Sequence, residues 1–182
     1  MKYLMLIGDA FEDVEALATQ DVLIRGGEEV ILASMMGRKE ITTKCGNSLV
    51  LSQTIDEVDL SSFDALIIPG GPGSFKILAF IKKVDEIISY FADKGKLVSA
   101  ICAAPMLIGR LGYLKGKNYT CYPGFEEYVV DGNYKRDEGV VCDNNFITAK
   151  SMYYSIDFGL RIYEFFHGKK ASESLRNACK GE

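Results

Sequence analysis

The stretch Leu97-Val98-Ser99-Ala100-Ile101-Cys102-Ala103-Ala104-Pro105 decides how this chain folds. A short, largely apolar run ends at a cysteine, and small residues that can open a helix follow at once. This order predicts a strand over 97–101, a tight turn at Cys102 and a helix over 103–111. The thiol then lies beside a helix N-terminus, where the helix dipole favours the reactive thiolate. Cys102 is therefore a candidate nucleophile.

Further apolar runs of strand length lie on both sides of this stretch, at residues 2–7, 29–33, 64–68 and 146–149. Helical patterns lie between several of them, at 13–25, 74–92 and 153–166. Strands that are apolar on both faces and alternate with helices predict a mostly parallel sheet covered by helices on both sides. The expected fold class is therefore α/β.

Two local signals refine this expectation. Asp143-Asn144-Asn145 separates two apolar runs and predicts a hairpin turn, so the sheet carries a small antiparallel addition. Gly26-Gly27 is a stop signal for the first helix. No repeat, low-complexity segment or linker interrupts residues 1–182, so a single domain is predicted.

Composition excludes several classes of protein. The net charge of −4 and the lack of a basic stripe argue against a nucleic-acid binder. No apolar run approaches the ~20 residues of a membrane span, and Gly8-Asp9 ends the first run too early for a signal peptide. The five cysteines are scattered without a CxxC pair, which predicts neither a disulfide framework nor a metal site. We expect a cytoplasmic protein that needs no metal.

Three segments meet at the edge of the predicted sheet where the parallel strands end, which is where such folds place their functional crevice. Strand 2–7 leads into a carboxylate-bearing helix start, strand 64–68 into Pro69-Gly70-Gly71-Pro72-Gly73, and strand 97–101 into Cys102. The backbone N–H groups at Gly70 and Gly71 can bind an oxyanion. The alternative is a loop that only needs unusual dihedral angles. No Gly-Lys-Ser/Thr follows, so a phosphate-binding loop is not predicted.

Glu15 is the candidate carboxylate of this edge. On a helical wheel it lies beside Ala18 and Val22, at the margin of the apolar stripe. A carboxyl group held there has a raised pKa and can share a proton with a thiol. Glu12 and Asp13 have no such argument for burial. The alternative is that all three acidic residues serve the helix N-terminus.

Two further groups bear on partners and on the chemistry. Asp21 and Arg25 stand four residues apart near the middle of the same apolar stripe, which favours contact with a second chain. The alternative is a partly covered ion pair at a helix end. The single histidine, His167, lies at the end of helix 153–166, where a cation suits the dipole. A Cys–His dyad within one chain is therefore not predicted, and the remaining cysteines are interpreted as small buried residues.

Taken together, these residues resemble the ThiJ/PfpI superfamily (also called DJ-1/PfpI), in the branch of the Parkinson-disease protein DJ-1 and its bacterial relatives. The resemblance covers nearly the whole chain. It rests on Phe11-Glu12-Asp13-Val14-Glu15, Ile67-Ile68-Pro69-Gly70-Gly71, Ala100-Ile101-Cys102-Ala103-Ala104-Pro105, Tyr122-Pro123 and Ile147-Thr148-Ala149.

The resemblance implies a flavodoxin-like three-layer sandwich and a homodimer. It implies that Cys102 is the reactive cysteine on a strained nucleophile elbow and that Glu15 hydrogen-bonds to it. It also implies an anion pocket formed by the N–H groups of Gly71 and Ala103. An arginine of the first helix that reaches the partner subunit's site corresponds to Arg25.

Two positions depart from related branches. One branch has a histidine directly before the proline that is Pro123 here, whereas this chain has Tyr122. The phenol of Tyr122 can donate a hydrogen bond in the pocket, or the ring can simply pack there. The protease-like branch has a histidine directly after the cysteine, and this chain has Ala103, which counts against a peptidase. A mechanism that needs an imidazole is therefore not expected.

The resemblance implies a cofactor-free, Cys-dependent enzyme on small reactive aldehydes such as methylglyoxal, either a glutathione-independent glyoxalase or a protein deglycase that removes early glycation adducts. Such an enzyme protects against carbonyl stress. In this hypothesis Cys102 attacks the aldehyde and Glu15 moves protons. The alternative is a non-enzymatic redox sensor or stress-protective protein in which Cys102 oxidises to a sulfinate held by Glu15.

Overall fold

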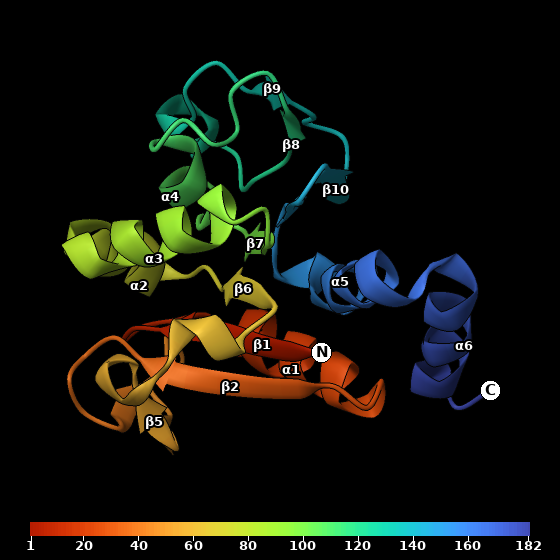
Figure 1. Ribbon diagram of the computed structural model, residues 1–182, viewed down its shortest axis with the longest axis horizontal. Helices are drawn as coiled ribbons and strands as arrows, with labels where there is room; N and C mark the ends of the chain where they lie inside the picture. The colour runs from red at the N-terminus through yellow and green to blue at the C-terminus, as the bar shows by residue number, and fades with distance from the viewer.

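A computed structural model, which describes all of residues 1–182, places a seven-stranded sheet at the centre of the molecule (Figure 1). In spatial order the strands are β10 (Val140–Asp143), β11 (Phe146–Ala149), β7 (Leu97–Ile101), β6 (Ala65–Ile68), β1 (Lys2–Ile7), β2 (Glu29–Ser34) and β5 (Gln53–Thr54). Neighbouring strands are parallel except β10 and β11, which form the predicted antiparallel hairpin. The prediction of a mostly parallel sheet is confirmed.

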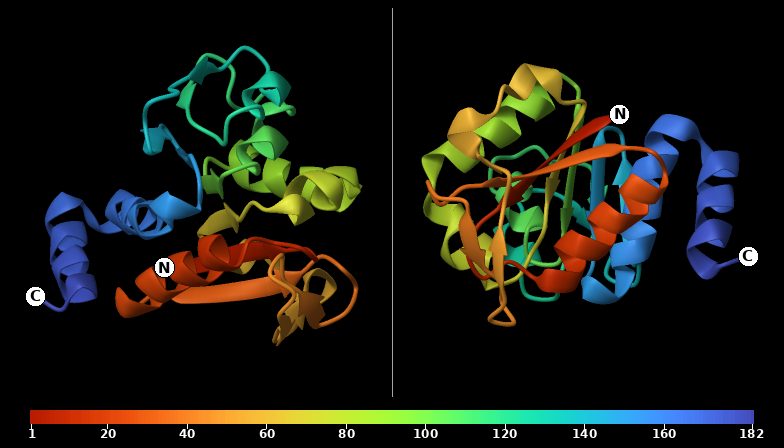
Figure 2. Two further views of the ribbon diagram at one scale, coloured as in Figure 1. Left: turned by 180° about the vertical axis from the view of Figure 1, so that it is seen from behind. Right: turned by 90° about the horizontal axis from the view of Figure 1, so that it is seen from below.

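Helices cover both faces of this sheet, as the right-hand view of Figure 2 shows. One face carries α1 (Asp13–Arg25) and α5 (Ser155–His167), and the other carries α3 (Lys82–Asp93) and α4 (Pro105–Gly109). Along β1, Tyr3, Met5 and Ile7 pack in the cluster with α1 and α5, and Leu4 and Leu6 pack in the cluster with α3 and α4. Successive side chains of a strand point to opposite faces, so a strand that is apolar throughout needs a helix layer on each side. The three-layer α/β sandwich is therefore confirmed.

Smaller elements complete the chain. They are the hairpin β3 (Glu40–Thr42) and β4 (Ser48–Val50), the pair β8 (Asn118–Tyr119) and β9 (Asn133–Tyr134), and the helices α2 (Pro72–Lys76) and α6 (Lys169–Lys180). Short 3₁₀ turns are η1 (Ile55–Glu57), η2 (Leu60–Ser62), η3 (Leu78–Phe80), η4 (Glu126–Tyr128) and η5 (Met152–Tyr154). The β8–β9 pair lies in a lobe at the top of Figure 1, and α6 packs outside α5. None of the helices is long and apolar enough to cross a membrane.

The single helix expected over 74–92 is wrong, because α2, η3 and α3 occupy this segment. The helical backbone breaks at Ile77, with φ −124° and ψ −66°, and at Ile81, with φ −100° and ψ 105°. Between these breaks Leu78 is only 2% exposed. It packs so closely on Gly8 that a Cβ atom there would lie 2.9 Å from the Leu78 Cδ2. A continuous helix would lose this core contact.

Two other helix boundaries differ from prediction. The helix expected over 103–111 is α4, which is confined to Pro105–Gly109 because a turn at 102–104 follows the strand. The helix expected over 153–166 begins after η5. The chain then turns at Gly168, with φ +81°, into α6, which is separate from α5 and lies beyond the range expected for that helix.

Helices α1 and α5 pack closely through a glycine. A Cβ atom at Gly159 would lie 3.0 Å from the Val22 Cβ and 3.4 Å from the Thr19 carbonyl oxygen. The Thr19 hydroxyl, 0% exposed, donates a hydrogen bond of 3.4 Å to the Ser155 carbonyl. The close approach of these helices fixes α1, which carries Glu15, against the sheet.

We therefore expect Gly159→Val to lower the free energy of unfolding by about 2 kcal/mol, because the added methyl groups overpack the α1–α5 contact. Urea unfolding followed by circular dichroism measures this change. Ile156→Val keeps a β-branched side chain at an exposed position of the same helix and should change stability by less than about 0.5 kcal/mol. Equal stability of the two variants would contradict the role of Gly159.

Candidate active site

Cys102 has a left-handed backbone, with φ +65°, directly after β7 and before α4. Non-glycine residues adopt this conformation only where the surroundings hold it, at a cost of about 1–3 kcal/mol. Here the Cys102 N–H donates to the Ala149 carbonyl at 2.9 Å, and the Cys102 carbonyl accepts from the Tyr122 N–H at 2.8 Å. The neighbouring strand β11 and the segment before η4 thus hold the turn that leaves the thiol half-buried at the end of β7.

Glu15 approaches the same point from α1 and is 1% exposed, so the predicted burial of this carboxyl group is confirmed. Its Oε2 accepts a hydrogen bond of 2.8 Å from the Gly70 N–H. The interpretation of Glu12 needs correction, because Glu12 is also buried, at 6% exposed. Its Oε2 accepts from the Glu15 N–H at 2.8 Å and caps the start of α1.

Gly70 lies between the thiol and the carboxyl group, Gly71 follows it in the same loop, and neither position has room for a side chain. A Cβ atom at Gly70 would lie 2.7 Å from both the Cys102 Cβ and the Glu15 Oε2. Gly71 has φ +85°, and a Cβ atom there would also lie 2.6 Å from the Glu12 N. Close approach thus explains Gly70, and the left-handed dihedral together with close approach explains Gly71.

The charges of Glu15 and Cys102 depend on one another. Burial raises the pKa of Glu15 to about 7, although hydrogen bonds from Cys102 and Gly70 oppose the shift and the Glu12 charge adds to it. Burial also raises the pKa of Cys102, and the charge and hydrogen bond of Glu15 raise it further. The backbone N–H groups of Ala103 and Gly71 act on the sulfur in the opposite direction. Thiol and carboxyl group therefore share protons as one unit.

The expectation that the helix dipole governs the thiol is therefore wrong. Helix α4 has five residues and begins only at Pro105. Burial and the Glu15 carboxylate dominate, and both raise the pKa of Cys102. Formation of the Cys102 thiolate thus depends on whether Glu15 is protonated or ionised.

The thiol opens into a cavity of about 290 Å³ that is lined by Lys44, Gly71, Pro72, Phe75, Cys102, Ala103, Tyr122 and Phe125. Cys102, Gly71, Ala103 and Tyr122 were singled out from the sequence, and the structure brings them together in this lining. Tyr122 is 48% exposed and lies at the opening.

Sequence reasoning missed Lys44, Pro72, Phe75 and Phe125. Lys44 reaches the cavity because the β3–β4 hairpin is fastened to the loop after β1. The Lys44 N–H donates to the Phe11 carbonyl at 2.9 Å, and the Thr42 N–H donates to the Asp9 Oδ1 at 3.0 Å. Asp13 accepts from the hairpin tip, at 3.2 Å from the Cys45 N–H. Strands of three residues carry no readable alternation, and Gly46-Asn47 is the local signal of this turn.

Arg25 is not brought to the thiol by its own chain. It lies about 15 Å along α1 from Glu15, at ~1.5 Å per residue. It forms an exposed ion pair of 2.7 Å with Asp21. The predicted place of this pair in the buried stripe is wrong, because the buried residues of α1 are Glu15, Ala16, Thr19, Val22 and Leu23. The pair instead lies on the exposed face, with Val14, Leu17 and Ile24.

His167 is engaged away from the cavity. Its Nε2 lies 2.8 Å from the Glu28 Oε1, at the end of α5. The interpretation of His167 as a helix-end residue is confirmed. No group of three or more His, Cys, Asp or Glu side chains is arranged to hold a metal ion.

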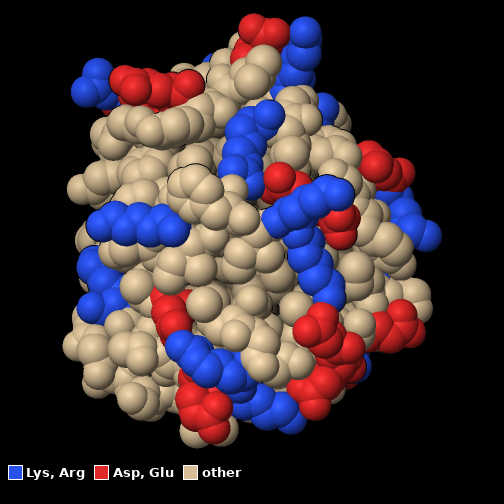
Figure 3. Space-filling model, turned by 90° about the vertical axis from the view of Figure 1, so that its left-hand side faces the viewer, with Lys and Arg blue, Asp and Glu red and all other residues tan.

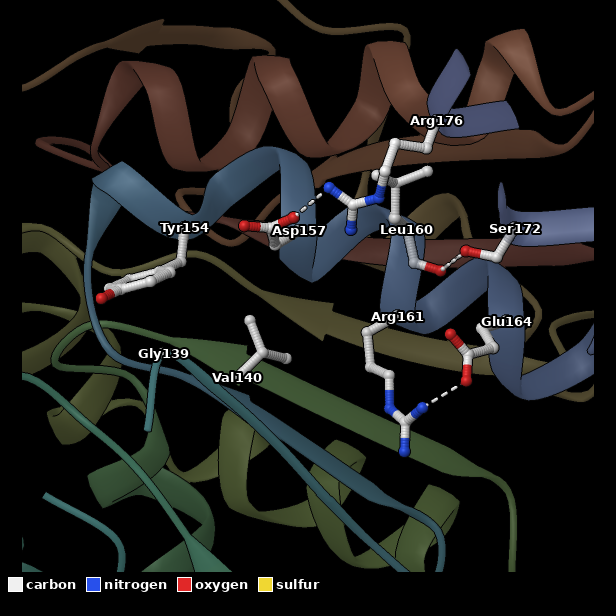
Figure 4. Close-up of a pocket in the computed structure, with 9 residues that line it drawn as sticks. All are labelled: Gly139, Val140, Tyr154, Asp157, Leu160, Arg161, Glu164, Ser172 and Arg176. Atoms are coloured by element: carbon white, nitrogen blue, oxygen red, sulfur yellow. Dashed lines mark hydrogen bonds and ion pairs between the residues drawn. The ribbon is translucent and has the colours of Figure 1, made fainter. Parts of the chain in front are cut away.

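A second cavity of about 280 Å³ lies between α5, α6 and the start of β10 (Figure 4). Its charged side chains pair with one another: Arg176 contacts Asp157 at 2.6 Å, and Arg161 pairs with Glu164. The hydroxyl of Ser172 donates to the Leu160 carbonyl at 3.0 Å. These groups satisfy each other, and no thiol lines this cavity.

Figure 3 shows the side of the molecule toward which β1 and β2 run in Figure 1. Basic and acidic side chains are interspersed there among uncharged surface. No broad field of one sign covers this face. Lys44 is the single charged residue that lines the Cys102 cavity.

The chain is similar in sequence and in structure to known proteins of one family. The model of the DJ-1/PfpI family matches residues 1–165. The chain is 34% identical to a glutathione-independent glyoxalase of Caenorhabditis elegans, over 90% of this chain and 87% of that protein. It is also 34% identical to a deglycase of Pyrococcus horikoshii, over 82% and 90% of the two chains. The crystal structure of DJ-1beta from Drosophila melanogaster has a TM-score of 0.90 at 27% identity, covering 98% and 96%.

The raised pKa of Glu15 predicts a pH-dependent stability. A carboxyl group that titrates near 4.5 when unfolded and at about 7 when folded stabilises the fold fully below pH 4.5. That contribution, about 3 kcal/mol, is lost as the pH rises through 7. Glu15→Gln does not titrate, so its unfolding free energy should rise relative to the wild type by about this amount between pH 4.5 and 8. Urea unfolding of both proteins across this range measures the difference, and parallel profiles would contradict it.

Proposed function

The chain belongs to the DJ-1/PfpI family, and from this premise we propose that it is a Cys-dependent enzyme acting on small reactive carbonyls, as a glutathione-independent glyoxalase or protein deglycase. The observation that carries the proposal is the thiol of Cys102 beside the buried carboxyl group of Glu15, with two backbone N–H groups at the sulfur. Relatives named for these two activities support it. Each proposed step uses only protein groups, substrate and water.

The first step is addition of the thiol to the aldehyde carbon of methylglyoxal. The Cys102 proton passes to Glu15, whose pKa of about 7 suits a group that accepts and returns protons near neutral pH. The sulfur–carbon bond forms, and the carbonyl electron pair moves to oxygen. The N–H groups of Gly71 and Ala103, which lie at the reacting sulfur, stabilise this oxyanion. Glu15 then gives the proton it took from Cys102 to the oxyanion, which completes the hemithioacetal and restores the Glu15 carboxylate.

The second step moves hydrogen within the bound substrate. The Glu15 carboxylate takes the proton from the former aldehyde carbon, and an enediol forms. Return of a proton to the neighbouring carbon gives a thioester of lactate on Cys102. Water then cleaves the thioester, which releases lactate and restores the thiol. The sum is methylglyoxal plus water to lactate, with no net oxidation.

Glycated groups fit the same chemistry. A hemithioacetal or aminocarbinol formed between methylglyoxal and a protein side chain releases the aldehyde reversibly, and Cys102 then consumes it. The half-buried thiol reaches solvent only through its cavity, which is wide enough for a three-carbon aldehyde. We therefore assign the protein to protection against carbonyl stress.

A reducing compartment suits a reactive thiol, and we place the protein in the cytoplasm. All five cysteines are free in the structure, including the exposed Cys45. Disulfides are rare in the cytosol, where thiols are kept reduced. A permanently reduced Cys102 is what turnover requires.

We further propose a homodimer through the exposed face of α1. Val14, Leu17 and Ile24 are 40%, 39% and 51% exposed on this face, which also carries the ion pair of Asp21 and Arg25. In η5, the turn that precedes the neighbouring helix α5, Tyr153 is 80% exposed. Exposed apolar side chains on one face favour an interface. An arginine too far from the thiol of its own chain can then serve the site of the partner.

Turnover tests the proposed function directly. Cys102→Ser and Glu15→Ala should each lower lactate formation from methylglyoxal at least ~10³-fold, because each removes a group that bonds or moves a proton in the transition state. Cys45→Ser, which changes an exposed thiol outside the cavity, should retain full activity. Unchanged turnover in the first two variants would contradict the proposal. Selective gain of two oxygens at Cys102 after mild peroxide, without carbonyl turnover, would instead favour the redox sensor.

Sedimentation velocity tests the homodimer. Wild type should sediment as a dimer and Leu17→Glu as a monomer, because the new charge must be desolvated in the interface. Val130→Glu changes a residue that is 50% exposed in the lobe and should leave the dimer intact. Arg25→Ala should keep the dimer and lower kcat/KM about tenfold, through loss of a charged contact. A monomeric wild type would contradict the interface.

A further inference from the structure

A groove of about 260 Å³ adjoins the Cys102 cavity. It is lined by Phe75, Ala79, Phe80, Met106, Arg110, Phe125 and Tyr128. Phe75 and Phe125 also line the cavity of the thiol. The two hollows therefore share a wall of two aromatic rings.

The shared wall continues as a row of rings. The ring centroids of Phe75 and Phe125 are 5.1 Å apart, and those of Phe125 and Tyr128 are 6.2 Å apart. Across the groove Phe80 is 82% exposed, and Tyr128 is 53% exposed at its end. Aromatic rings held this openly beside a reaction cavity offer stacked and edge contacts to another ring.

The charge of the groove argues for a neutral occupant. Arg110 is its only charged lining residue. One terminal nitrogen of Arg110 donates to the Ala79 carbonyl at 2.6 Å, and the other pairs with Asp85 at 2.5 Å. The guanidinium charge is thus compensated inside the protein. The free cation of the site, Lys44, lies in the Cys102 cavity, where the polar carbonyl end of a substrate reacts.

We propose that this groove binds the aromatic tail of the substrate, so that the preferred substrates are 2-oxoaldehydes whose keto carbon carries an aryl group. This inference rests on the proposed function and assigns its substrate class. The 2-oxoaldehyde head lies between Cys102 and Lys44, and the ring lies over Phe75 and Phe125 toward Phe80. Methylglyoxal fills the first cavity and leaves the groove empty.

Alkylation of Cys102 tests the groove without requiring turnover. Iodoacetamide and its N-phenyl derivative, iodoacetanilide, have the same reacting carbon: the thiolate sulfur forms a bond to it and iodide leaves. We expect the ratio of rate constants, iodoacetanilide to iodoacetamide, to be roughly tenfold higher for Cys102 than for glutathione, because the ring loses contact with water in the groove. Peptide mass spectrometry assigns the label to Cys102 rather than to the exposed Cys45.

Two variants change the groove and leave the reacting groups alone. Ala79→Leu fills it and should bring the ratio down to that of glutathione. Phe80→Ala removes an exposed ring and should lower the ratio several-fold. Phe165→Ala removes a ring that is 41% exposed at the far end of α5 and should leave the ratio unchanged. A wild-type ratio equal to that of glutathione, or one that both groove variants leave intact, would overturn the proposal.

Turnover separates this inference from the proposed function. The wild type should form mandelate from phenylglyoxal with a kcat/KM about tenfold above that for lactate from methylglyoxal, and Ala79→Leu should lose only this advantage. Equal turnover of both substrates in the wild type would overturn the substrate class and leave the glyoxalase intact. The alkylation preference without any turnover would support the groove as a binding site and contradict the proposed enzyme.

Discussion

The whole site depends on the left-handed backbone at Cys102. With φ +65° the chain turns sharply out of β7, and this turn brings the thiol to the edge where the other strands end. The strain of about 1–3 kcal/mol is held by backbone hydrogen bonds to Ala149 and from Tyr122. The loops around it adapt to that turn. Gly70 has no room for a Cβ atom beside the thiol. Ala10, with φ +57°, is also left-handed, and it lies in the loop that leads to Glu12 and Glu15.

The buried carboxyl group of Glu15 is the second consequence of this arrangement. A carboxyl group that is 1% exposed destabilises the fold when it ionises. Burial therefore raises the pKa of Glu15 to about 7, so that both its protonated and its ionised form are populated near neutral pH. That cost has a chemical use. In a site without histidine, a carboxyl group that gains and loses its proton near neutral pH can replace the imidazole as the partner of the thiol. The same helix presents Leu17 and Arg25 outward, so α1 positions the proposed acid–base group on one face and the proposed partner contact on the other.

The proposed reaction centre and the proposed tail groove present different surfaces to a substrate. Around Cys102 the contacts are backbone N–H groups and one lysine, which suit any small carbonyl. Beyond Phe75 the surface changes to aromatic rings, with the charge of Arg110 already neutralised by Asp85. The Cys102 cavity and the adjoining groove, which share Phe75 and Phe125, therefore offer different physical environments to a polar head and an apolar tail. Under the proposed function, this difference lets the same thiol chemistry act on substrates that differ in their tails.

The amino-acid sequence by itself determined the sheet, the two helix layers and the meeting of Cys102, Gly70 and Glu15 at one edge, because apolar runs, helical spacing and strand ends are local patterns. Tertiary structure alone decided the rest. Lys44 and Phe75 enter the cavity through contacts between segments that share no periodic signal. The shift of the Cys102 pKa is also opposite to the expected one. The pKa is raised, because burial and the nearby Glu15 carboxylate outweigh the dipole of a short helix. Electrostatics in a folded protein depends on what surrounds a charge in space, and neighbours along the chain do not define those surroundings.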